Sequence, residues 1–121
     1  MKRDIKGKED LHLLMEKFYA KATKDEVIGV KFEHIDMEEH LPKIVEFWST
    51  IIFFDGNYKG SPFDKHVPLH LEKQDFERWL MLFEATINEL FEGEKADEVL
   101  QRAQSIARIF LFKIESLNLM K

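Results

Sequence analysis

Cysteine is absent from this chain. Its absence excludes disulfide bonds, thiolate zinc sites, iron-sulfur clusters, haem attached through thioether bonds and cysteine nucleophiles. A metal ion in this protein must therefore be bound by histidine or carboxylate side chains.

Long apolar stretches are missing as well. The longest mostly apolar run, Phe47 to Phe54, contains Ser49 and Thr50, and the basic N-terminus is not followed by an apolar segment. The sequence therefore predicts neither a signal peptide nor a membrane span, and we expect a cytoplasmic protein.

A net positive charge is also lacking. The chain has 18 basic and 23 acidic residues, which gives a formal net charge of -5. An acidic protein repels phosphate backbones and anionic lipids, so we expect no nucleic-acid or membrane partner. The sequence contains neither a Gly-x-Ser-x-Gly motif nor a phosphate-binding glycine loop, so catalysis by a side-chain nucleophile has no support.

Glycine and proline are few, at five and three residues, and they divide the chain into four long segments. In each segment apolar residues recur at intervals of three and four, which is typical of an amphipathic helix, and none alternates with the period of a strand. We expect one all-α domain of residues 1–121, with helices at about 9–24, 36–53, 74–91 and 96–117. This pattern fits a simple four-helix bundle as well as a globin-like fold.

The second helix has the clearest start. Asp36, with Glu39 three residues later, is typical of a capping box. Pro42 fits a helix start, because the first turn does not use its amide hydrogens and the fixed φ of proline suits a helix. Turn-forming residues between 55 and 68 leave room for one or two helical turns, near 63–67.

Three polar or aromatic residues lie where apolar side chains are expected. Tyr19 lies on the buried face of the first helix, His40 at the N-terminal end of the apolar face of the second, and Trp79 faces inwards on the third. Each also has an ordinary interpretation. Tyr19 and Trp79 would then be core aromatics, and His40 a capping or surface histidine near Glu38 and Glu39.

His66 stands in the irregular connection, where a short turn could direct its imidazole towards the middle of the helices. A neutral imidazole nitrogen is a good axial ligand for haem iron. A solvated loop histidine is the ordinary alternative. A zinc pair of His66 and His70 is the competing metal site, but Pro68 between them opposes the necessary helix and no third ligand is evident.

Seven short motifs follow one another in an order and spacing that resembles the truncated haemoglobins of group III. They are Phe18-Tyr19, Gly29-x-x-Phe32, His40-Leu-Pro, Phe47-Trp48, Tyr58-x-Gly60-x-Pro62-x-x-x-His66, Arg78-Trp79-Leu80-x-x-Phe83 and Arg102-Ala-x-x-Ile-Ala107. The resemblance runs from about Leu11 to Ile109. The approach to His66 and the lack of paired glycines between helices favour group III over its sister groups.

The chain departs from the family pattern at two places. Val30 stands where family members usually have proline, which loosens the corner before Phe32. The stretch before the third long helix lacks a histidine expected closer to Phe76, which leaves the contacts to the haem propionates undefined.

The resemblance implies a globin shortened to a two-over-two helical sandwich around haem b. The four long helices correspond to the globin B, E, G and H helices, and His66 to the proximal iron ligand. The further residues that it places beside the haem are Phe32, Phe47, Trp48 and Tyr58. It implies that Tyr19, His40 and Trp79 form a polar distal wall.

Such a site implies binding of the diatomic gases O2, NO and CO. Polar donors that stabilise bound O2 slow its release, which favours nitric oxide dioxygenase or peroxide chemistry served by a separate reductase. Reversible O2 binding or gas sensing is the non-enzymatic alternative, and a haem-free helical interaction module is a more remote one. We expect a monomer or a weak dimer.

Overall fold

The computed structural model describes residues 2–33, 35–54 and 71–119, with side chains up to Leu117. Within these ranges the chain is helical and contains no strand. The elements are α1 (Lys8–Ala22), the short 3-10 helix η1 (Gly29–Phe32), α2 (Met37–Phe53), α4 (Lys73–Leu90) and α5 (Glu94–Leu119). The all-α prediction is confirmed, and each long helix begins and ends within a few residues of its expected bounds.

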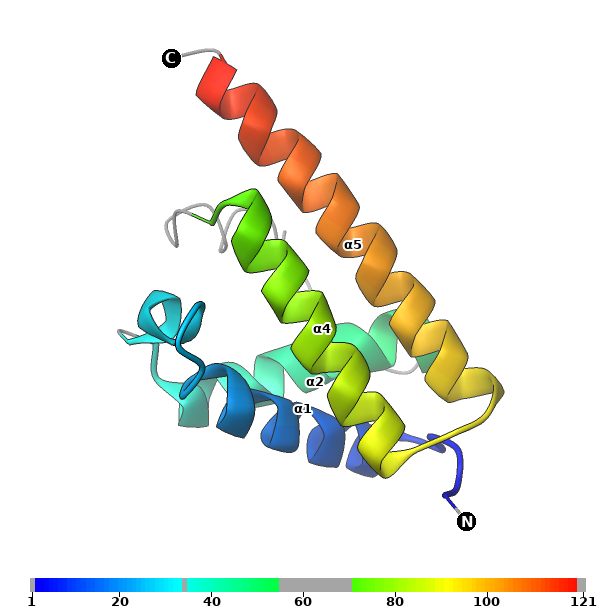
Figure 1. Ribbon diagram of the computed structural model, residues 1–121. Coiled ribbons are helices and arrows are strands. Elements are labelled where there is room, and N and C mark those ends of the chain that lie inside the picture. Colours follow the sequence, from blue (N-terminus) through cyan, green and yellow to red (C-terminus); the bar gives the residue numbers. More distant parts are fainter. Residues whose placement is uncertain (1, 34, 55–70, 120–121) are drawn as a thin grey trace.

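The four long helices form two antiparallel pairs (Figure 1). The helices α1 and α2 lie side by side in one layer, and α4 and α5 cross over them in the other. Contacts of α1 with α4 join the two layers, so the expected two-over-two arrangement is confirmed. None of the described helices is long and apolar enough to cross a membrane.

The start of α2 agrees with the sequence pattern in part. The Asp36 carboxylate accepts hydrogen bonds from the amides of Glu38 and Glu39, at 3.0 and 3.4 Å, so Asp36 is the predicted N-cap. The Glu39 carboxylate pairs instead with Lys43, at 3.2 Å. The sequence predicted that Pro42 would lie in the first turn of the helix. This prediction is wrong, because α2 begins at Met37 and Pro42 lies in its second turn. Because proline has no amide hydrogen, Pro42 removes one regular backbone hydrogen bond from the second turn of the helix.

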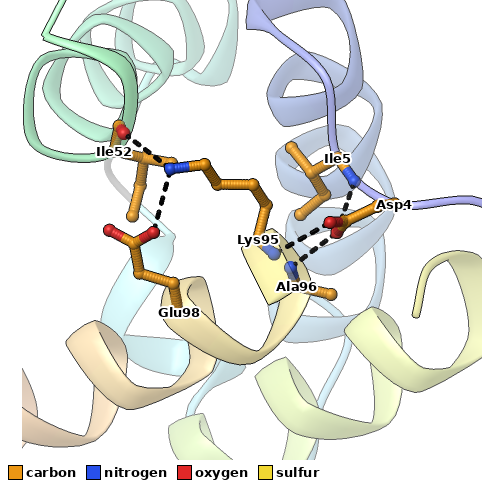
Figure 2. Close-up of polar contacts among 6 residues, drawn as sticks. All are labelled: Asp4, Ile5, Ile52, Lys95, Ala96 and Glu98. Carbon is orange, nitrogen blue, oxygen red and sulfur yellow. Dashed lines mark hydrogen bonds and ion pairs between the residues drawn. The ribbon is translucent and has the colours of Figure 1, made fainter. Parts of the chain in front are cut away.

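The N-terminal segment caps α5 (Figure 2). The Asp4 carboxylate accepts hydrogen bonds from the amides of Lys95 and Ala96, at 2.9 and 2.8 Å, and from the amide of Ile5 at 2.8 Å. The first amides of a helix have no partner within the helix, so this carboxylate satisfies two of them. Gly93 allows the close approach, since a Cβ atom there would lie 2.6 Å from Asp4 Cγ and its φ is +136°.

The Lys95 side chain links the same helix start to the end of α2 (Figure 2). Its Nζ donates to the Glu98 carboxylate at 3.0 Å and to the Ile52 carbonyl at 3.5 Å. It also lies 5.5 Å from the centre of the Phe53 ring. The last carbonyls of a helix favour a positive charge, so Lys95 stabilises the end of α2.

We predict that Asp4→Ala lowers the free energy of unfolding by about 1 to 2 kcal/mol, because two amides at the start of α5 lose their acceptor. Chemical denaturation with urea measures this loss. Asp97→Ala is the matched control, since Asp97 is an exposed acidic residue in the same first turn. An equal loss in both variants would contradict the capping role.

The effect of Asp4 depends on pH with a defined sign. Burial raises the pKa of the Asp4 carboxyl, but its bonds from the amides of Lys95, Ala96 and Ile5 outweigh burial and hold the pKa below its usual value. A carboxyl whose pKa is lower in the folded state than in the unfolded state stabilises the fold at pH values above its unfolded pKa of about 3.9. This stabilisation is lost as the pH falls through the pKa of the folded state. The difference between the parent and Asp4→Ala therefore shrinks below about pH 4.

Candidate functional site

Two fully buried phenylalanines form the centre of the aromatic core. Phe18 of α1 and Phe83 of α4 meet edge to face, with ring centres 5.2 Å apart. Phe83 also stacks on Trp79, one turn earlier in α4, at 4.9 Å and 8°, and on Trp48 of α2 at 5.6 Å and 21°. Such ring pairs have preferred geometries, so Phe83 brings the two indoles against one ring.

Tyr19 is the point at which three elements meet. Its ring contacts Phe32 of η1 with centres 5.7 Å apart, and His40 of α2 with centres 5.9 Å apart, both edge to face. It also meets the neighbouring Phe18 ring at 4.9 Å. Tyr19 is 7% exposed, as the helical period predicts, and burial raises the pKa of its hydroxyl above the usual value. The hydroxyl therefore keeps its proton and can donate a hydrogen bond.

The side-chain polar atoms of Tyr19 and Trp79 form no hydrogen bond within the described part of the chain. In residues 2–33, 35–54 and 71–117, neither the Tyr19 hydroxyl nor the Trp79 indole N–H has a hydrogen-bond partner. Among the described residues, no fully enclosed side-chain nitrogen or oxygen lacks a hydrogen-bond partner.

The corner between α1 and η1 places Phe32 against Tyr19. The Thr23 hydroxyl donates to the Tyr19 carbonyl at 2.7 Å at the end of α1. The chain then returns so closely that a Cβ atom on Gly29 would lie 2.8 Å from the Thr23 carbonyl oxygen. Glycine is required by this approach, which gives the Gly29-x-x-Phe32 motif its physical reason.

The structure brings the predicted distal residues together. Phe18 contacts Trp79, with ring centres 5.5 Å apart, and so joins it to the group of Tyr19, Phe32 and His40. His40 is half-buried and lies at the end of α2 that the sequence predicts.

The residues expected beside the haem fall into two groups. Trp48 is 3% exposed and belongs to the core, and Phe47, half-buried, meets it at 5.6 Å. Their contact with haem stays a prediction. Tyr58 and His66 lie outside the described residues, as does His70 of the zinc alternative. Within the described ranges, no three His, Asp or Glu side chains come together as a metal site.

The sequence motifs include Phe18 and Phe83, but the sequence analysis assigned neither a role in the site. The signal was present, because Phe18 precedes Tyr19 and Phe83 follows Trp79 by one helical turn. The half-buried ion pair of Asp25 and Arg78 was also missed. Its members are 53 residues apart, so no local spacing indicates the pair.

Comparisons with known proteins agree with this geometry. A family model described as bacterial-like globin matches residues 3–111. The group 3 truncated hemoglobin ctb of Campylobacter jejuni subsp. jejuni serotype O:2 is 38% identical over 117 residues, which cover 91% of this chain and 92% of that protein. The crystal structure of the group III truncated hemoglobin from Campylobacter jejuni matches with a TM-score of 0.84 and 37% identity, over 94% of this chain and 95% of that chain. The resemblance drawn from the sequence motifs is thus confirmed over nearly the whole chain.

We predict that Phe83→Leu lowers the free energy of unfolding by about 1 kcal/mol, because it keeps most of the volume but removes two stacking contacts. The near-ultraviolet circular dichroism of the tryptophans should weaken with it. Phe112→Leu is the control, since Phe112 is 71% exposed on α5. Equal changes in the two variants would contradict the central position of Phe83.

Proposed function

Because this chain belongs to the bacterial-like globins, and among them to the group III truncated haemoglobins, which are haem proteins that bind diatomic gases, we propose that it holds O2 at a haem b group. In this proposal His66 is the proximal ligand of the iron. Tyr19, His40 and Trp79 form the polar wall on the opposite, distal side.

The observation that carries the proposal is the meeting of three donor side chains from three helices beside one aromatic cluster. Tyr19 contacts His40 directly, and Trp79 joins them through Phe18. Two of these donors have no partner in the described part of the chain. Haem is a flat apolar ring with a polar centre, so aromatic walls with a few donors suit it.

The residues present fit such a group in their chemistry. Phe32 is an aromatic side chain at the corner next to Tyr19, where the family places a ring against the porphyrin. When bound, haem supplies an iron atom with a coordination position for a diatomic gas and with redox chemistry. The chain supplies the proximal imidazole and the donors.

The distal donors slow the release of O2. A neutral hydrogen bond contributes about 0.5 to 1.5 kcal/mol, so two or three of them lengthen the residence of O2 by about one to three orders of magnitude. The raised pKa of the Tyr19 hydroxyl keeps its proton in place at ordinary pH.

Slow release suits reaction at the haem better than delivery of O2. We propose that the reaction is that of held O2 with nitric oxide. The alternative reaction is activation of peroxide, in which the polar donors would assist cleavage of the O–O bond. A bound haem would supply redox chemistry that consumes electrons in each turnover, so we propose a separate reductase as a partner. Fast release of O2 would instead favour reversible binding or sensing.

We predict that the purified protein binds haemin with one-to-one stoichiometry, and that its Soret band shifts on reduction and again with CO. His66→Ala should lose this spectrum, because the iron loses its only proximal ligand. Visible absorption during a haemin titration measures both. His12→Ala is the control, since the His12 side chain is 50% exposed on α1.

An unchanged spectrum in His66→Ala would reject His66 as the ligand. Failure of the parent protein to bind haem saturably would reject the haem site as a whole.

We predict that Tyr19→Phe and Trp79→Phe each raise the O2 dissociation rate by about two- to tenfold, the value of one neutral hydrogen bond. Stopped-flow displacement of O2 measures the rates. CO dissociation, measured in parallel, should change less, because bound CO carries less negative charge than bound O2. Fast O2 release that neither substitution affects would contradict the polar wall.

A further inference from the structure

An ion pair joins the turn after α1 to the second turn of α4. Arg78 Nε donates to both carboxylate oxygens of Asp25, at 2.9 and 3.1 Å, and Arg78 Nη2 lies 2.8 Å from Asp25 Oδ1. The Asp25 side chain is 6% exposed and the Arg78 side chain 31%. The guanidinium bond holds the pKa of Asp25 below its usual value, so the carboxyl is charged at ordinary pH.

Asp25 also shapes the turn that leads to η1. Its carboxylate accepts hydrogen bonds from the amides of Val27 and Ile28, at 2.9 and 3.2 Å, and its carbonyl accepts one from Gly29 at 2.9 Å. The ion pair therefore attaches to α4 a turn that is held by hydrogen bonds to Asp25, and this turn leads into the corner that contains Phe32.

A second charge contact joins the end of the same corner to α4. Lys31 Nζ lies 3.9 Å from Asp75 Oδ2, and Asp75 is 3% exposed. The Asp75 carboxylate also accepts a hydrogen bond from the Glu72 amide at 2.8 Å, at the start of α4. Asp75 and Arg78 are three residues apart and so lie on one face of the helix.

A half-buried ion pair such as Asp25–Arg78 contributes more to the relative position of the two segments that it joins than to the free energy of unfolding. The cost of removing a buried carboxylate from water offsets much of its attraction to an arginine, whereas the guanidinium fixes direction as well as distance. Apolar rings join α1 and α4 at Phe18 and Trp79, and rings alone tolerate small shifts along a helix. Arg78 directly precedes Trp79, so a shift of one moves the other.

We propose that the Asp25–Arg78 pair is a positioning device for the distal wall, which sets the place of the Trp79 indole relative to Tyr19 and Phe32. The inference rests on the proposed function, since the wall must act on a bound gas. Asp25 and Arg78 themselves touch neither haem nor gas in this proposal. They act through Trp79.

The test compares Asp25→Asn in the parent and in a Trp79→Phe background, in the haem-loaded full-length chain. Asparagine keeps an oxygen for the amides of Val27 and Ile28 but loses the charge. We expect O2 dissociation to rise by about two- to tenfold in the parent background, and to change less than about twofold when Trp79 is already replaced. The infrared C–O stretching band of the CO complex should shift or broaden in the first case alone.

Glu89→Gln is the matched control. Lys21 and Glu89 also join α1 to α4, with Nζ and Oε2 2.5 Å apart, but at the surface, where the side chains are 38% and 58% exposed. This variant should leave the O2 rate and the C–O band unchanged. Arg78→Lys, which keeps the charge without the planar fork, is the second variant, and we expect a change in the same direction as for Asp25→Asn.

The outcomes separate the two proposals. If Trp79→Phe changes the O2 rate but Asp25→Asn and Arg78→Lys do not, only the positioning role is overturned, even if their unfolding midpoints fall. Equal effects of Asp25→Asn in both backgrounds also overturn it, because the pair would then not act through Trp79. If neither Trp79→Phe nor Tyr19→Phe changes the rate, the polar wall itself fails.

Discussion

The contact between Phe18 and Phe83 is the interaction on which the rest of this structure depends. It joins α1 to α4, and thus one layer of the sandwich to the other, while Trp48 brings α2 to the same ring. Each of these side chains is nearly or fully buried. Since protein cores are packed at the density of organic crystals, a change in one ring is transmitted to its neighbours.

The candidate site takes its geometry from that contact. Tyr19 follows Phe18 by one residue and Trp79 precedes Phe83 by one turn, so each polar side chain shares a backbone with a core ring. The Tyr19 hydroxyl has no hydrogen-bond partner among the described residues, and the Tyr19 ring lies beside His40. Local rules are most often broken at functional sites, and Tyr19 fits that expectation.

The sequence was enough to predict the four helices, because their apolar periods are long and strong, and it also predicted the cap at Asp36. It placed Tyr19 on the buried face for the same reason. It did not predict that Asp4 caps α5 from 91 residues away, or that Asp25 pairs with Arg78. Such contacts leave no local pattern, since each residue alone resembles an ordinary surface charge. Pro42 was misplaced because the helix begins one turn earlier than the proline indicates.

Apolar and charged contacts have different roles in this fold. Ring packing decides which helices meet, and its preferred geometries allow more variation in position than hydrogen-bonded ion pairs and caps do. The two ends of α4 are both held by directional contacts. Near the start of α4, Asp25 forms an ion pair with Arg78. Beyond the end of α4, the Glu92 amide donates a hydrogen bond to the Arg3 carbonyl at 3.1 Å, next to the Asp4 cap. Trp79 lies between these two contacts, so the position of its indole depends on the contacts at both ends of α4 as well as on the stacked Phe83 ring.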